Sequence, residues 1–97
     1  MDIDQARTFL AITANGSFLE AARQLHLTQS TISARIQRLE DELGTRLFVR
    51  NRAGASLTPA GRRFFDYAKR LVLTAEQARE DAGLPERYRA SLRIGGR

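Results

Sequence analysis

The sequence predicts a mainly α-helical fold that carries one β-hairpin. Three stretches before residue 45 place apolar residues at helical spacing, and each stretch is bounded by residues typical of helix ends. A short β-prone run with a glycine in its turn then breaks the helical spacing, and a long helical stretch follows Pro59. We therefore expect three helices, a hairpin and a fourth, longer helix, in that order.

The first two expected helices are short. The first occupies residues 3–14 and ends at "NG", a dipeptide typical of a helix C-cap. Ser17 and Glu20 then match a capping box, in which the serine and glutamate side chains each accept a backbone N–H at the helix start. This pattern places the first residue of the second helix at Phe18.

A third helix is expected to begin after Thr28, its N-cap, and to run to about Leu43, before Gly44. Its apolar residues share one face, while the opposite face changes from small polar side chains to acidic ones. Such short side chains allow a helix to approach another surface closely. The apolar face consists of Ile32, Ile36, Leu39 and Leu43, and the small polar region consists of Gln29, Ser30, Thr31, Ser33 and Ala34.

The hairpin is expected directly after the third helix. Residues 47–49 form a β-prone run, and the segment "RNRAGA" that follows is rich in residues that favour turns. Gly54 supplies the positive φ that a tight hairpin turn requires. Arg50 and Arg52 are therefore expected near the tip of this hairpin.

The fourth helix is expected from Pro59 to about Ala82, with Thr58 as its N-cap. Its apolar residues recur at alternating spacings of four and three, which is typical of a helix that packs against a partner helix. Because the rest of the chain offers little to cover this seam, a second copy of the chain is favoured over an intramolecular core stripe. The expected dimerisation residues are Phe64, Phe65, Ala68, Leu71, Val72, Ala75 and Ala78.

The chain of 97 residues carries a net charge of +5, and the positive excess is concentrated in its middle. Residues 21–70 hold ten basic residues against four acidic ones, whereas the two ends are close to balance. Fifteen of the sixteen basic residues are arginine, whose planar guanidinium suits bidentate bonds to phosphates and to guanine edges. The basic region coincides with the expected third helix and hairpin, so a nucleic acid is a candidate partner.

Several other functions find little support in the sequence. The chain has no cysteine and a single histidine, His26, which argues against a zinc or redox site. Glu40, Asp41 and Glu42 are consecutive on a helix and point in different directions, so they do not form an acid–base pair. No apolar run reaches the ~20 residues of a membrane span, and the acidic N-terminus is unlike a signal peptide. We therefore expect neither an enzyme nor a membrane protein, no cofactor in this chain, and a cytoplasmic location.

Two short helices joined by a tight turn, with small polar groups on the second, describe a helix-turn-helix. The basic hairpin makes the predicted fold a winged helix-turn-helix, a three-helix body plus a β-hairpin wing, followed by a long linker or dimerisation helix. The sequence resembles the N-terminal DNA-binding domain of LysR-type transcriptional regulators over about residues 3–82. The resemblance is carried by the pattern "AARxLxxTQSxxSxxIxxLExxLGxxLFxR" and by the "LTPAG" that opens the fourth helix.

This resemblance implies a homodimer through the linker helices, with a tetramer as an alternative in a longer protein. It implies binding to double-stranded DNA at interrupted palindromes near promoters, on the bacterial nucleoid. It also implies a following ligand-binding domain with a small-molecule effector, and "SLRIG" near the end resembles the first strand of that domain. We expect a DNA-binding domain in 1–58, a linker helix in 59–82, and in 83–97 a hinge and the start of an effector-binding domain that is missing from this chain.

A recognition helix enters the major groove with its N-terminal end, which identifies the expected DNA contacts. Gln29 suits an adenine edge or a phosphate, and the hydroxyls of Ser30 and Ser33 suit either bases or the backbone. Thr28, at the cap, directs free N–H groups and the positive end of the helix dipole at a phosphate. The expected DNA-binding residues are Thr28, Gln29, Ser30, Thr31, Ser33, Ala34, Gln37, Arg38, Arg50 and Arg52.

The family pattern departs from this sequence at two of these positions. Many relatives have proline where this chain has Ser30, and a longer polar or basic residue where it has Ala34. Because Ala34 offers only a methyl group, base discrimination by this helix is expected to depend on Gln29 and Gln37. The wing arginines match family positions that contact the minor groove or the backbone, and Arg38 suits a phosphate.

Two alternatives stay open from the sequence. The first is a related winged-helix regulator, such as a molybdate-responsive type, whose N-terminal domain is similar. The second is a dimerising helical interaction module in which the basic charge is incidental and the small polar face is simply solvated.

Overall fold

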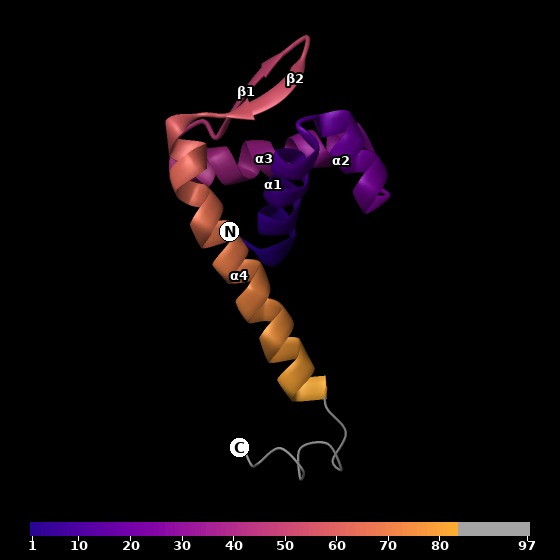
Figure 1. The fold of residues 1–97 in the computed structure, drawn as a ribbon, viewed down its shortest axis with the longest axis vertical. Helices are drawn as coiled ribbons and strands as arrows, with labels where there is room; N and C mark the ends of the chain where they lie inside the picture. Colours follow the sequence, from indigo (N-terminus) through magenta and orange to yellow (C-terminus); the bar gives the residue numbers. More distant parts are fainter. Residues whose placement is uncertain (84–97) are drawn as a thin grey trace.

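Three helices form the body of the molecule, a β-hairpin stands beside them, and a long helix runs away from the body (Figure 1). The computed structural model describes residues 1–83, and it confirms the predicted mainly helical fold with its two-stranded antiparallel wing. The elements are α1 (Ile3–Asn15), α2 (Phe18–Leu25), α3 (Gln29–Leu43), β1 (Phe48–Asn51), β2 (Gly54–Leu57) and α4 (Pro59–Gly83).

The helix starts are defined by local capping, but the predicted capping box at α2 is only half formed. The hydroxyl of Ser17 accepts the N–H of Glu20 at 3.2 Å, while the Glu20 carboxylate accepts from Arg23 at 3.0 Å. The complete capping box precedes α1, where Asp2 and Gln5 each accept the other's backbone N–H, at 2.8 and 2.9 Å. At α2, Arg23 lies three residues after Glu20 and competes for its carboxylate. This competing partner explains why the capping box is complete at α1 and only half formed at α2.

Helix α3 begins and ends as predicted. Thr28 accepts the N–H of Thr31 at 3.1 Å, and Gly44 adopts φ 71° as the C-cap, a conformation that favours glycine. Three of the four predicted apolar residues of this helix are buried, but Leu43 is 37% exposed. Leu43 lies at the end of α3, where the body leaves an open hollow beside α4.

The wing is a two-stranded hairpin, as the sequence predicted, and it is attached to the body. Its two strands pair from Phe48 opposite Leu57 to the turn at Asn51 and Gly54. Gly54 has φ 134°, and a Cβ at this position would collide with the carbonyl oxygen of Gly16 in the turn between α1 and α2. The same oxygen accepts the N–H of the next residue in β2 at 2.9 Å. The wing therefore sits directly against the turn at the end of α1.

One aromatic cluster connects the body, the wing and the long helix. The ring of Phe9 in α1 lies 5.2 Å from Phe48 in β1 and 5.0 Å from Phe64 in α4, measured between centroids. Phe18 in α2 lies 5.6 Å from Phe48, measured between the ring centroids. These buried rings hold four elements together, because edge-on aromatic pairs add to the stabilisation from buried apolar area.

The first half of α4 packs on α1, and its second half extends beyond the body (Figure 1). Phe64 and Ala68 are buried in this contact, and an Arg7–Glu76 ion pair of 3.1 Å continues it along the helix. The helix spans Pro59–Gly83, within one residue of the prediction. The strand predicted at "SLRIG", and the rest of the predicted 83–97 segment after Gly83, lie outside the described residues.

Candidate nucleic-acid interface

The exposed N-terminal end of α3 carries the small polar side chains predicted to contact DNA. Gln29, Ser30 and Ala34 are exposed, and Thr31 and Ser33 are half-buried. The Thr28 hydroxyl lies 3.1 Å from that of Ser30 and 2.9 Å from that of Thr31. These hydroxyls and the uncapped N–H groups beside them form a compact surface of hydrogen-bonding groups.

Gln37 and Arg38, the two remaining predicted residues of α3, differ in whether their side chains are already hydrogen-bonded within the chain. Gln37 donates from Nε2 to Asp41 at 2.9 Å, so its amide is already engaged along the helix. Arg38 is exposed. The neighbouring Arg35 donates to the hydroxyl of Thr8 at 3.3 Å, which directs its guanidinium toward α1. The structure thus separates an arginine that is free to meet a phosphate from one that packs on the body.

The two wing arginines lie in different settings. Arg52 is in the two-residue turn at the tip of the wing and is exposed. Arg50 lies in β1, two residues before Arg52, and its guanidinium carbon lies 3.9 Å from the centroid of the Phe18 ring. A cation over an aromatic face is attracted to it, so Arg50 is held against the body while Arg52 is free.

The candidate interface keeps its positive charge. The ion pairs of residues 1–83 involve the N-terminal amine, Arg7 and Arg23, and the arginines of α3 and of the wing take no part in them. Asp41 and Glu42 lie at the other end of α3, and the Glu42 carboxylate pairs with the N-terminal amine. The side of the body that presents the start of α3 and the wing is therefore basic and uncompensated.

Glu40 has a role that was not recognised in the sequence. Its carboxylate is buried and accepts the N–H of Leu47 at 2.8 Å and that of Phe48 at 3.4 Å. These bonds fix the loop that leads from α3 into the wing. Its position in the sequence could have indicated this role. Glu40 follows Ile36 by four residues, so its side chain borders the apolar face of the helix.

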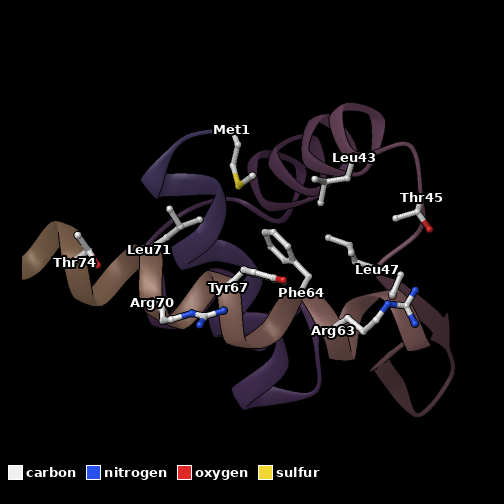
Figure 2. Close-up of a pocket in the computed structure, with 11 residues that line it drawn as sticks. Met1, Leu43, Thr45, Leu47, Arg63, Phe64, Tyr67, Arg70, Leu71 and Thr74 are labelled. Carbon is white, nitrogen blue, oxygen red and sulfur yellow. The ribbon is translucent and has the colours of Figure 1, made fainter.

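An apolar hollow of about 660 Å³ lies between the start of α4 and the end of α3. Figure 2 shows Met1, Leu43 and Leu47 on one side of it, facing Phe64 and Leu71 of α4. Tyr67, which also borders the hollow, is 60% exposed. Exposed apolar surface of this kind is typical of an interaction site.

Some residues of the predicted dimerisation seam are buried within this chain, and others are exposed. Phe64 and Ala68 are buried within this chain, and Phe65 and Val72 are partly buried against the same core. Leu71 and Ala78 are exposed and Ala75 is half-buried. Part of the seam is therefore covered without a partner, because α1 packs against it.

A three-helix body, an exposed polar helix start and a basic hairpin define a winged helix-turn-helix protein. A family model described as "Bacterial regulatory helix-turn-helix protein, lysR family" matches residues 3–62. The chain belongs to the LysR family of bacterial regulatory proteins.

Two kinds of relative support this assignment. The HTH-type transcriptional regulator HdfR of Yersinia enterocolitica is 43% identical over 81 residues, which is 84% of this chain and 28% of that protein. The crystal structure of the CbnR_DBD–DNA complex superposes with a TM-score of 0.80 at 33% identity, covering 84% of this chain and 94% of that one. The BenM_DBD/benA site 1 DNA complex gives a TM-score of 0.78 at 34% identity, with coverages of 84% and 92%. This chain therefore spans less than a third of the length of that regulator and nearly all of the two DNA-bound chains.

Metal clusters and membrane-spanning helices are two features that the described part of the chain lacks. Within residues 1–83, no group of three or more histidine, aspartate or glutamate side chains is arranged to hold a metal ion. No helix in the same range is both long enough and apolar enough to cross a membrane.

Proposed function

We propose that this chain binds double-stranded DNA sequence-specifically, with the start of α3 in the major groove and the wing on the adjacent minor groove and backbone. The observation that carries the proposal is the exposed, uncharged polar surface at the start of α3, flanked by unpaired arginines. An α-helix fits the major groove, and short side chains bring its backbone close to the base edges. The related chains solved with DNA support the same partner.

The proposed contacts fall into two classes. Thr28, Arg38 and the wing arginines bind phosphates and fix the register of the protein on the duplex. Gln29, with an amide that matches an adenine edge, reads bases together with Ser30 and Ser33, and Ala34 offers a methyl group to thymine. Gln37 joins this second class only if its amide exchanges Asp41 for a base edge.

We further propose that the DNA-bound form is a homodimer through α4. The hollow beside α3 and the exposed residues Leu71 and Tyr67 offer an apolar surface to a second copy of the chain. A two-fold dimer presents two α3 helices to half-sites separated by one helical turn of DNA or a multiple of it. The matching operator is an interrupted palindrome, placed near a promoter if the protein regulates transcription as HdfR is named to do.

The resemblance to LysR-type regulators implies a further domain that binds a small-molecule effector, with a tetramer as an alternative assembly, and we propose both for the longer protein. No residue of 1–83 is assigned to that effector.

The two alternatives raised by the sequence now differ in support. The family match favours a LysR-type regulator over a molybdate-responsive one, and the unpaired arginines favour DNA over a protein partner.

Selection of binding sites from random duplexes with this chain tests the proposal. We expect a single enriched motif, bound ~10³-fold or more tightly than scrambled duplex at physiological salt. Equal affinity for the enriched and scrambled duplexes would reject sequence-specific binding. A Gln37→Ala variant with altered base preference would place Gln37 among the base-reading residues.

A further inference from the structure

A polar cleft of about 440 Å³ separates α3 from the base of the wing. Ser33 and Gln37 line it on the α3 side, and Arg46 and Arg50 line it on the side of the wing. Its volume falls within the ~300–1,000 Å³ range of ligand pockets, which is ample for a phosphodiester group and its neighbouring sugars. Ser33, Gln37 and Arg50 are among the predicted DNA contacts, whereas Arg46 and Phe18, which also line the cleft, are not.

Arg50 is oriented before any ligand arrives. Its guanidinium stacks on Phe18 at 3.9 Å, and Phe18 is itself buried and held edge-on by Phe48 at 5.6 Å. Stacking on a ring leaves the N–H groups at the edge of the guanidinium available for an anion. Because the side chain is already ordered, it loses less conformational entropy when it binds.

Arg46 lines the cleft, and hydrogen bonds hold the backbone at this residue in place. Its carbonyl oxygen accepts the hydroxyl of Thr58 at 2.7 Å, and the next residue donates its N–H to Glu40. The side chain is exposed and takes no part in the ion pairs of residues 1–83. Arg46 therefore adds a second free positive charge to the same cleft.

The charge balance of the cleft favours an anion. Glu40 is the one acidic residue in its lining, against two arginines. The Glu40 carboxylate already accepts two backbone N–H groups, which compensate part of its charge. The hydroxyl of Ser33 adds a hydrogen-bonding group on the opposite wall, where the Gln37 amide is engaged with Asp41 at 2.9 Å.

We propose that this cleft seats one phosphate of the DNA strand that passes between α3 and the wing. Arg46 and Arg50 bind its oxygens, the Ser33 hydroxyl donates to it, and Phe18 is the positioning residue that holds Arg50. This inference rests on the proposed function, and it moves Ser33 from base reading to backbone contact. It also adds Arg46 and Phe18 to the residues that matter for DNA.

The first test measures the salt dependence of binding for Arg46→Gln and for the unchanged chain, on both enriched and scrambled duplexes. Losing one phosphate contact lowers the slope of log affinity against log salt by about 0.9 on both duplexes. Arg79→Gln is the matched control, because it removes the same charge from the far end of α4, away from the cleft. We expect this control to leave the slope unchanged.

The second test is a double-mutant cycle of Phe18→Leu and Arg50→Gln. If Phe18 acts through Arg50, Phe18→Leu weakens binding in the unchanged chain and has no further effect when Arg50 is already replaced. A purely structural role would weaken binding in both backgrounds. Urea unfolding of each variant shows whether it is folded, and Arg46→Gln decides the proposal if Phe18→Leu does not fold.

The outcomes separate this inference from the proposed function. An unchanged salt slope for Arg46→Gln, with specific binding retained, overturns the phosphate site alone. A loss confined to the enriched duplex makes Arg46 a base-reading residue and also overturns it. Failure of the unchanged chain to prefer any duplex overturns the proposed function, and the phosphate site with it.

Discussion

The exposed side chains at the start of α3 differ in what each offers a base pair. Gln29 presents both a donor and an acceptor and matches the two groups on the major-groove edge of adenine. Ser30 presents one hydroxyl that is already within 3.1 Å of Thr28, and Ala34 presents only a methyl group. Gln29 is therefore the residue of α3 from which we expect the largest share of base discrimination.

Replacing Gln29 with alanine tests this assignment. We expect Gln29→Ala to cost ~1–3 kcal/mol of binding free energy on the enriched duplex and little on scrambled duplex, because a base contact contributes only to the correct site. Fluorescence anisotropy titrations on the two duplexes measure the difference. An equal loss on both duplexes would make Gln29 a phosphate contact and would exclude it from base reading.

At the scale of elements, the connection between α3 and the wing depends on one buried carboxylate. Glu40 satisfies two backbone N–H groups at the start of β1, and Thr58 closes the other side of the same loop through its bond to Arg46. This arrangement sets the wing at a fixed position relative to the recognition helix. The spacing between major-groove and wing contacts is therefore built into the folded chain.

Variants of Glu40 are expected to show this dependence. Glu40→Ala leaves buried N–H groups without a partner and should lower the free energy of unfolding by about 1–3 kcal/mol, whereas Glu40→Gln retains an acceptor and should lower it less. Urea denaturation measures both. The control is Glu42→Ala, which removes only the surface ion pair with the N-terminal amine, with an expected change below about 1 kcal/mol. Equal effects of Glu40→Ala and Glu42→Ala would contradict the role of Glu40.

The elements differ in how well the sequence predicts them. Helix limits depend on caps such as Thr28 and Gly44, which act within a few residues, and these limits were predicted closely. The wing was placed correctly, but the register that pairs Phe48 with Leu57 depends on geometry that a single strand does not show. The cation–π contact of Arg50 joins residues 32 positions apart, and no local pattern indicates it.

The apolar face of a helix is easier to predict from the sequence than the part of the protein that packs against that face. The spacing of Phe64, Ala68 and Leu71 correctly indicates an apolar face on α4, but spacing alone does not tell which protein surface covers it. Gly61 shows the same limit, because a Cβ there would collide with the carbonyl oxygen of Leu47, a contact made only in the folded chain. The small residue at this position allows α4 to start close against the body.

At the scale of the whole molecule, α4 has one side on the body and another that is open. Leu71 borders the apolar hollow beside α3, whereas Leu73 borders a separate hollow with Asp66 and Lys69. Both leucines are exposed in the single chain, at 37% and 53%. The proposed dimer covers the first of these surfaces and leaves the second in solvent.

This difference gives a matched pair of variants. We expect Leu71→Glu to raise the dimer dissociation constant by about 10²–10³-fold, because it buries an unpaired carboxylate at the interface. Leu73→Glu places the same charge outside the interface and should leave the dissociation constant unchanged. Sedimentation equilibrium distinguishes the two. Dissociation by Leu73→Glu alone would place the interface on the opposite side of α4.

The central claim, that a dimer of this chain reads DNA sequence through two α3 helices, is tested most directly by hydroxyl-radical footprinting. The enriched duplex is probed with the unchanged chain, in excess random competitor DNA at physiological salt. We predict two protected half-sites related by two-fold symmetry, with centres one helical turn or a multiple of it apart. Uniform protection along the duplex, or protection that the random competitor removes, would contradict the claim.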